Sequence, residues 1–147
     1  MTVHLNSRVQ LAVSILLIRA DYVFLSQRRP SVRAYPGNWQ SVFFNVLGNE
    51  TPLAVARRRI CSATGISLRR DRCHLLGEIH LLSEAKRPCR LMVFRVALRH
   101  GEVPLGKEPR LPPWIPFPIG EVSSLRPQTP TLKCSLELLF SQGGIRV

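Results

Sequence analysis

The spacing of apolar and polar residues divides the first part of the chain into strands and a loop. Residues 9–18 form a run of bulky and β-branched side chains, which predicts a central strand. Residues 22–27 predict a second, shorter strand. Residues 28–36 carry two prolines and predict a loop. Residues 39–46 then predict a strand, or a strand with a bulge.

A helix follows, and residues with specific backbone preferences mark both of its ends. Thr51 can cap the N-terminus, Pro52 suits the first turn, and Gly65 suits the left-handed conformation that ends a helix. Between these ends, apolar side chains recur at steps of three and four residues: Leu53, Ala56, Ile60 and either Ala63 or Thr64. This spacing predicts a short helix with one apolar stripe.

The second half of the chain combines a strand pair with proline-rich connections. Residues 73–82 and 90–99 predict an antiparallel pair, joined near Pro88. Three segments follow: a proline-rich loop over 104–118 that enters a strand through Trp114, a short turn or helix over 119–125, and a helix over 130–142 stopped by Gly143 and Gly144.

The segment around the first predicted helix resembles the Nudix box. The family pattern is G-x5-E-x7-R-E-U-x-E-E-x-G-U, where U is a bulky aliphatic residue. When the pattern is aligned on its last glycine, five residues occupy matching positions: Glu50, Arg58, Ile60, Gly65 and Ile66.

The residues on either side of the box strengthen the resemblance. Residues 27–30 (Gln-Arg-Arg-Pro) and 35–39 (Tyr-Pro-Gly-Asn-Trp) are similar to the family's approach to the box. Gly106-Lys107-Glu108, followed by Trp114, is similar to the MutT branch. The resemblance implies an α/β (α+β) fold, namely an α/β/α sandwich with a mixed central sheet, one Nudix-box helix and a C-terminal helix. At 147 residues, we expect a single Nudix-like domain over 1–147.

The chain departs from the family pattern at the positions that define its chemistry. Arg59 stands at the first helix glutamate, and Ser62 and Ala63 stand at the paired glutamates. Phe43 and Phe44 occupy the two glycine positions. Because phenylalanine enters positive φ only at a cost, we expect these two residues to alternate along a strand, with one ring in the core.

The loss of these glutamates bears on metal binding. The resemblance implies hydrolysis with Mg²⁺ or Mn²⁺, held mainly by oxygen ligands from the box helix. Glu50 and Glu108 are the only carboxylates carried over, so they are the candidate catalytic residues of a hydrolase, with Glu50 as its one candidate metal ligand. Without hydrolysis, we expect no cofactor.

The composition is strongly basic, with 21 Lys and Arg against 9 Asp and Glu, a net charge of +12 and a pI near 11.2. Such an excess of positive charge favours binding to polyanions, because binding releases the counterions that surround them. The candidate phosphate- or nucleic-acid-binding residues are Arg28, Arg29, Arg57, Arg58, Arg59, Arg69 and Arg70, and Trp114 can stack on a base. The alternative is that the arginines form a solvated face, with Arg58 paired to Glu50.

The four cysteines have no C-x2-C spacing, and the four histidines form no metal-ligand cluster. We therefore expect buried free thiols in a reducing intracellular compartment, with the cytoplasm first and the mitochondrion as the alternative. The apolar run over residues 11–18 is too short to span a bilayer. We expect it to be a first strand and not a signal segment, and we expect no membrane partner.

Three hypotheses for the function follow. The first is a non-catalytic Nudix-like domain that binds nucleotide or RNA phosphate through arginines, within a ribonucleoprotein assembly. The alternative is a divergent hydrolase that cleaves a nucleoside diphosphate linked to another moiety, with weak metal-dependent activity. The third is an interaction module whose charge serves an acidic protein partner.

Overall fold

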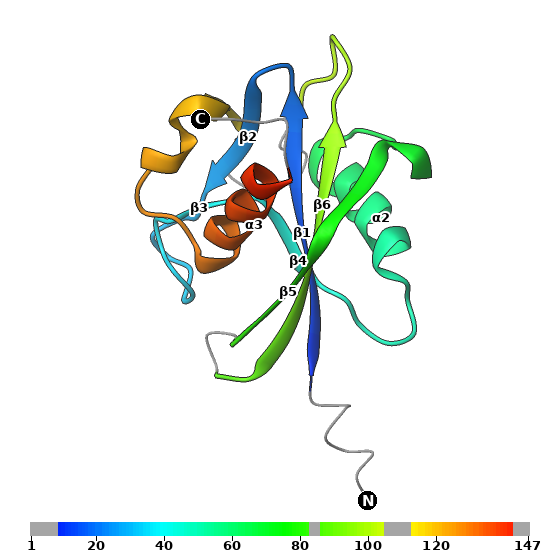
Figure 1. Ribbon diagram of the computed structural model, residues 1–147, viewed down its shortest axis with the longest axis vertical. Helices are drawn as coiled ribbons and strands as arrows, with labels where there is room; N and C mark the ends of the chain where they lie inside the picture. The colour runs from blue at the N-terminus through cyan, green and yellow to red at the C-terminus, as the bar shows by residue number, and fades with distance from the viewer. Residues whose placement is uncertain (1–8, 83–85, 105–112, 143–147) are drawn as a thin grey trace, which may run out of the picture.

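A computed structural model describes residues 9–82, 86–104 and 113–142. Strand β1 (Gln10–Arg19) lies at the centre of a mixed sheet (Figure 1). It pairs in parallel with β6 (Pro88–Ala97) and antiparallel with β2 (Tyr22–Gln27) and β4 (Val42–Asn45). The remaining strands extend the sheet on both sides: β5 (Cys73–Leu82) beside β6, and β3 (Trp39–Gln40) and β7 (Ile115–Pro118) beside β2.

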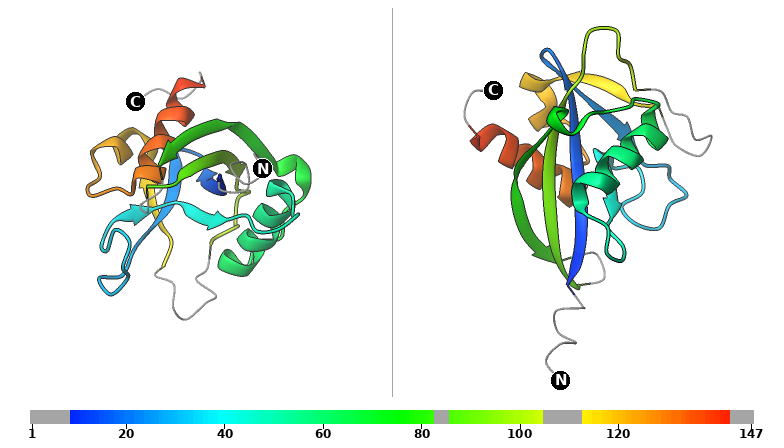
Figure 2. Two further views of the ribbon diagram at one scale, coloured as in Figure 1. Left: turned by 90° about the horizontal axis from the view of Figure 1, so that it is seen from below. Right: turned by 90° about the vertical axis from the view of Figure 1, so that its right-hand side faces the viewer.

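Two helices cover opposite faces of this sheet, α2 (Pro52–Thr64) on one and α3 (Pro130–Ser141) on the other (Figure 2). The arrangement follows from β1, because successive side chains of a strand point to opposite faces. Val13, Ile15 and Leu17 pack in the cluster that contains α2, whereas Ala12 and Leu16 pack in the cluster that contains α3. The predicted α/β/α sandwich with a mixed sheet is confirmed.

The predicted strand over residues 39–46 is present but interrupted at Ser41. β3 pairs with β2, whereas β4 pairs with β1, so the chain changes partner at this residue. The hydroxyl of Ser41 lies 2.7 Å from that of Ser14 on β1, which lies 2.8 Å from that of Ser135 on α3. All three serines are buried. A hydroxyl chain therefore crosses from the strand break to α3.

Phe43 and Phe44 lie on β4 and point to opposite faces, as predicted. Phe44 is only 5% exposed and belongs to the α2-side core, whereas Phe43 packs against the α3-side core. The backbone at the family's two glycine positions is therefore extended strand and not a tight turn.

The predicted caps of α2 are also confirmed. The Thr51 hydroxyl accepts a hydrogen bond from the Ala54 backbone N–H, and Gly65 is left-handed with φ of 80°. The predicted apolar stripe was wrong in detail, because Val55 is buried and Leu53 only partly so. The reason is that Val55 packs in the same core cluster as β1 and the 66–68 segment, whereas Leu53 lies at the edge of this cluster.

Other boundaries differ by a few residues. The second strand of the β5–β6 pair begins at Pro88 and ends at Ala97, earlier than the predicted 90–99, because proline is tolerated at the first position of a strand. The strand predicted through Trp114 begins at Ile115. Residues 119–124 form a 3-10 turn, η2 (Ile119–Ser124), and residues 28–36 are a loop as predicted. Gly143 and Gly144 lie outside the described residues.

The prediction of buried free thiols was only partly correct. All four are free thiols, but only Cys89 is buried, and Cys61 is exposed on the outer face of α2. Burial raises the pKa of the Cys73, Cys89 and Cys134 thiols. Among the described residues, no helix has the length and apolar character needed to span a membrane.

One ion pair joins the turn that precedes β5 to the loop that follows β6. Arg72, in the 3-10 turn η1 (Arg70–Arg72), donates to the carboxylate of Glu102, and its Nη2 also donates to the Ala97 carbonyl at 3.0 Å. The Arg72 hydrogen bonds hold the pKa of the Glu102 carboxyl below its ordinary value, and the Arg99 N–H adds to this effect. Both side chains are largely buried.

This pair gives a prediction on pH dependence. Because the pKa of Glu102 is lower in the folded than in the unfolded chain, its stabilisation is complete above the unfolded pKa of about 4.3 and is lost as the pH falls through the folded value. We expect Glu102→Gln to lower the free energy of unfolding at pH 6. In urea titrations, the difference in unfolding free energy between this variant and the wild type should shrink towards pH 3. A difference that does not depend on pH would contradict the lowered pKa of Glu102.

Candidate functional site

A small pocket of about 150 Å³ lies between α2, the β3–β4 segment and Trp114. Arg59, Ser62 and Ala63, the three residues that replace box glutamates, all line it. These residues share one face of α2, because positions three and four apart in a helix are neighbours. The opposite wall is formed by the β3–β4 segment: Gln40, Ser41, Val42, Phe43 and Phe44. We call this the box pocket.

Arg59 brings a positive charge to the box pocket. Its guanidinium carbon lies 5.7 Å from the centroid of the Phe44 ring, within the range of a cation–π contact. The side chain is exposed, so the cation remains accessible to a ligand. The Arg59 side chain therefore lies beside the Phe44 ring, which is buried in the core.

Arg58 points elsewhere and pairs with Glu50, as the alternative interpretation predicted. Two guanidinium nitrogens of Arg58 donate to the two carboxylate oxygens of Glu50, on an exposed face. The hydrogen bonds from Arg58 hold the pKa of Glu50 below its ordinary value. A metal ion at Glu50 would have to displace this arginine.

Arg57 supports the loop that follows the helix. Its Nε donates to the Leu68 carbonyl at 2.9 Å, and its side chain is half-buried. The three consecutive arginines therefore point in three directions, as expected from helical geometry. Of the three, Arg59 alone lines the box pocket.

The other predicted arginines do not form one patch with these. Arg28 and Arg29 belong to the 28–38 loop, beside β2 and β3, whereas Arg69 and Arg70 lie where the chain leaves α2 for β5. Figures 1 and 2 show these segments on opposite sides of the molecule. Arg28 is half-buried and donates to Gln40 and to the Ala34 carbonyl, while Arg29, Arg69 and Arg70 are exposed.

Trp114 lines the box pocket and packs against the α2-side core. Its indole N–H is buried and has no acceptor among the described residues. An unpaired buried donor costs free energy. Base stacking by Trp114 stays a prediction, and Glu108 lies outside the described residues.

The side chains at the box pocket do not fit a divalent metal ion. Mg²⁺ and Mn²⁺ require several hard oxygen ligands, ideally carboxylates, in octahedral geometry. The pocket offers a guanidinium, a hydroxyl and a methyl group at the three relevant positions. In the described part of the chain, no group of three His, Cys, Asp or Glu side chains comes together.

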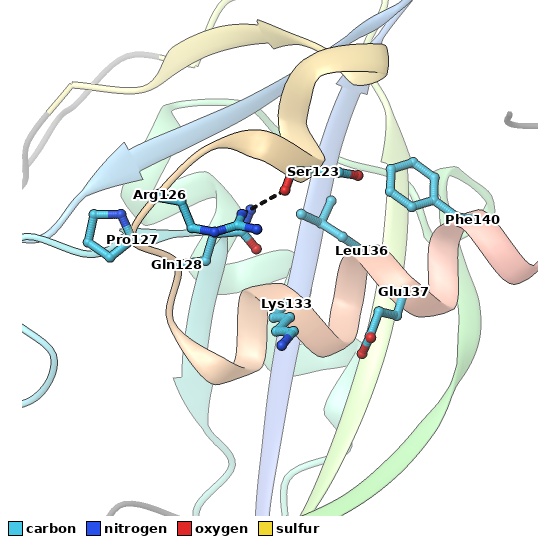
Figure 3. A pocket seen from close by; sticks show the side chains of 8 residues that line it. All are labelled: Ser123, Arg126, Pro127, Gln128, Lys133, Leu136, Glu137 and Phe140. Atoms are coloured by element: carbon cyan, nitrogen blue, oxygen red, sulfur yellow. Dashed lines mark hydrogen bonds between the residues drawn. The ribbon is translucent and has the colours of Figure 1, made fainter. Parts of the chain in front are cut away.

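A larger cleft of about 490 Å³ lies between the η2 turn and α3, and sequence reasoning did not find it (Figure 3). Arg126 and Lys133 bring positive charge to it, and Glu137 a negative one. The Arg126 guanidinium is held by the Ser123 carbonyl at 2.7 Å. The cleft depends on the packing of η2 against α3, which no local sequence signal indicates.

Comparisons with known proteins place this geometry in a fold family. No family model matches the chain, and no curated protein matches it. Among solved structures, the MutT NUDIX hydrolase from Burkholderia pseudomallei is 22% identical and superposes with a TM-score of 0.71 over 88% of this chain and 97% of its own.

Two other structures with this fold are similar over most of their length. The NUDIX domain of Shewanella oneidensis NrtR, complexed with ADP ribose, has a TM-score of 0.73 at 15% identity, over 91% of this chain and 88% of its own. The C-terminal domain of mouse MUTYH, in complex with human PCNA, has a TM-score of 0.67 at 17% identity over 95% of each chain. The chain therefore has the Nudix fold of the MutT-like proteins.

Proposed function

We propose that this chain is a non-catalytic Nudix-fold domain that binds a phosphate of a nucleotide or RNA, without a metal ion, in the box pocket. The observation that carries the proposal is the position of Arg59. It stands where the family has a metal-binding glutamate, and its guanidinium lines the pocket beside Phe44 and Trp114. A guanidinium matches the geometry of phosphate oxygens and replaces the metal ion as the bridge to phosphate.

Electrostatics disfavours the hydrolase alternative. Two unit charges about 4 Å apart interact by roughly 4 kcal/mol at an effective dielectric of 20, and a divalent ion doubles this value. A metal ion in the box pocket would meet this repulsion from Arg59, and Glu50 is already engaged with Arg58. The same charge attracts a phosphate.

The charge of the rest of the chain supports a polyanionic ligand. Three of the described carboxylates, Glu50, Glu78 and Glu102, are paired with arginines, and each pair removes one positive and one negative charge, so the net charge of +12 lies on the remaining residues. From Tyr22 to Asn49 the sequence contains three arginines and no carboxylate. RNA, as part of a ribonucleoprotein assembly, is the ligand that this balance favours. The NrtR structure shows that a Nudix domain can bind a nucleotide derivative, ADP ribose.

The first prediction concerns Arg59→Glu. We expect this change to weaken binding of a mixed-sequence single-stranded RNA by about tenfold to a hundredfold, because one charge-assisted contact is lost. The slope of log affinity against log salt should fall by roughly 0.7, the value for one phosphate of a single strand. Fluorescence anisotropy at three salt concentrations, with and without EDTA, measures the RNA affinity and its salt dependence.

The matched control is Lys133→Glu, which changes the charge equally on α3, in the cleft of Figure 3. It should weaken binding much less than Arg59→Glu. Equal effects of the two variants would mean that only the overall charge matters, and parent binding that is lost in EDTA would reject a metal-independent site.

The second prediction concerns catalysis. With Mg²⁺ or Mn²⁺, we expect no release of phosphate or nucleoside monophosphate from a panel of nucleoside diphosphate derivatives, measured by phosphate detection and chromatography. Brisk turnover that Glu50→Gln and Glu108→Gln each abolish would establish the hydrolase alternative. Turnover unchanged in both variants would point to a contaminating enzyme.

The third prediction tests the geometry of the box pocket. Since residues 59, 62 and 63 line one pocket, the triple variant Arg59→Glu, Ser62→Glu, Ala63→Glu should bind Mn²⁺, whereas the parent should not. Mn²⁺ electron paramagnetic resonance titration measures the difference. The control carries the same number of new carboxylates, and the same change in charge, at exposed positions outside the pocket: Cys61, Ser67 and Arg70. Equal Mn²⁺ binding by both variants would contradict the shared pocket.

A further inference from the structure

The cleft between η2 and α3 combines an apolar floor with charged walls (Figure 3). The floor is formed by Leu136, which is buried, and Phe140, which is half-buried. Around it stand three exposed charged residues, Arg126, Lys133 and Glu137. We call this the α3 cleft. Because α3 and α2 cover opposite faces of the sheet, the α3 cleft and the box pocket are separate sites (Figure 2).

Arg126 presents an edge of its guanidinium that no described residue occupies. Its Nη1 donates to the Ser123 carbonyl at 2.7 Å and to the Leu125 carbonyl at 3.1 Å, so both hydrogens of this nitrogen are used. Nε and Nη2 have no acceptor in the described part of the chain. Together they form the parallel fork that matches the two oxygens of a carboxylate. The turn itself is braced by Gln128, whose Nε2 donates to the Val122 and Leu125 carbonyls, each at 2.9 Å.

Lys133 and Glu137 place opposite charges one helical turn apart, on the side of the cleft that α3 forms. Their spacing of four residues allows an ion pair. Over the described ranges, however, neither side chain takes part in a salt bridge or a hydrogen bond. The ammonium and the carboxylate are therefore both available to a ligand, and with Arg126 the cleft offers two cations and one anion.

This combination of groups indicates the class of ligand. A nucleic acid strand carries a negative charge at every nucleotide and would meet the carboxylate of Glu137. A second copy of this chain, with a net charge of +12, would be repelled by the first. A protein segment has the complementary groups, namely a carboxylate for Arg126 and Lys133, an apolar side chain for the floor, and backbone N–H donors for Glu137. The volume of about 490 Å³ lies in the range of sites for drug-sized ligands, and suits a few amino-acid residues.

We propose that the α3 cleft docks an acidic segment of a protein partner, in which an aromatic side chain lies close to an Asp or Glu. The aromatic ring packs on Leu136 and Phe140, and the carboxylate accepts hydrogen bonds from the fork of Arg126 beside Lys133. Buried aromatic anchors and charge-assisted bonds to arginine carry much of the binding energy of protein interfaces. The net positive charge of the chain also raises its rate of encounter with an acidic partner.

Synthetic peptides test the α3 cleft directly. Four fluorescent peptides of eight residues, built on alanine and serine, each hold one Phe and one Asp, which are separated by zero, one, two or three residues. Fluorescence anisotropy with the full chain should find at least one peptide that binds. In that peptide, we expect the replacement of Asp by Asn, or of Phe by Ser, to weaken binding about tenfold.

Variants of the chain locate the contact to the carboxylate. Arg126→Gln should weaken binding of the Asp peptide about tenfold but leave binding of the Asn peptide unchanged, because the two changes remove the same contact. The matched control is Arg33→Gln, which removes one charge at an exposed position of the 28–38 loop and should change neither affinity. Lys133→Gln should weaken binding of the Asp peptide about threefold, and it breaks no hydrogen bond of the turn that holds Arg126.

Nuclear magnetic resonance titrations separate a protein ligand from RNA. The peptide should shift the amide signals of Lys133, Glu137 and Phe140, and single-stranded RNA at the same concentration should not. Failure of all four peptides to bind, equal binding of the Asp and Asn forms, or equal effects of Arg126→Gln and Arg33→Gln would each overturn the docking site. RNA that displaces the peptide and shifts the same signals would make the cleft a nucleic-acid surface instead.

Discussion

The burial of β1 on both faces is the constraint on which the rest of the structure depends. A strand with apolar side chains on both faces needs a cover on each side, and α2 and α3 supply these covers. Because α2 packs over Val13, Ile15 and Leu17, the directions in which the other faces of this helix point are fixed as well. The face that carries Arg59, Ser62 and Ala63 then meets β3 and β4 and forms the box pocket. The position of the candidate site is therefore a consequence of core packing.

The structure separates arginines that look equivalent in the sequence. Arg57, Arg58 and Arg59 are consecutive, yet one supports a loop carbonyl, one pairs with a carboxylate, and one lines a pocket. Net charge is therefore a poor guide to a site, because much of the arginine content serves the fold. Arg72 and Arg28 are further examples, because Arg72 donates to the Ala97 carbonyl at the end of β6 and Arg28 donates to the Ala34 carbonyl within its own loop.

The parts of the fold that sequence predicted are those governed by local chemistry. Thr51 and Gly65 fixed the ends of α2 because a cap depends on a few adjacent residues. The opposite orientations of Phe43 and Phe44 followed from the alternation of a strand. By contrast, the break at Ser41, the burial of Val55 and the bond from Arg57 to the Leu68 carbonyl depend on segments distant in the chain. A small pocket of about 150 Å³ between the 28–38 loop and the start of α3 draws its lining from six segments of the chain and carries no local signal.

The buried hydroxyls of Ser14, Ser41 and Ser135 couple these distant segments in a way that restricts change. Each hydroxyl has one proton, and the row ends at the Thr131 carbonyl, 2.7 Å from Ser135, which can only accept. Replacing any one serine by alanine would leave a neighbour in the dry interior without its partner. The three positions are therefore expected to vary together or not at all among related chains. β1, the break between β3 and β4, and α3 are thus constrained together by one row of hydroxyls, although they lie far apart in the sequence.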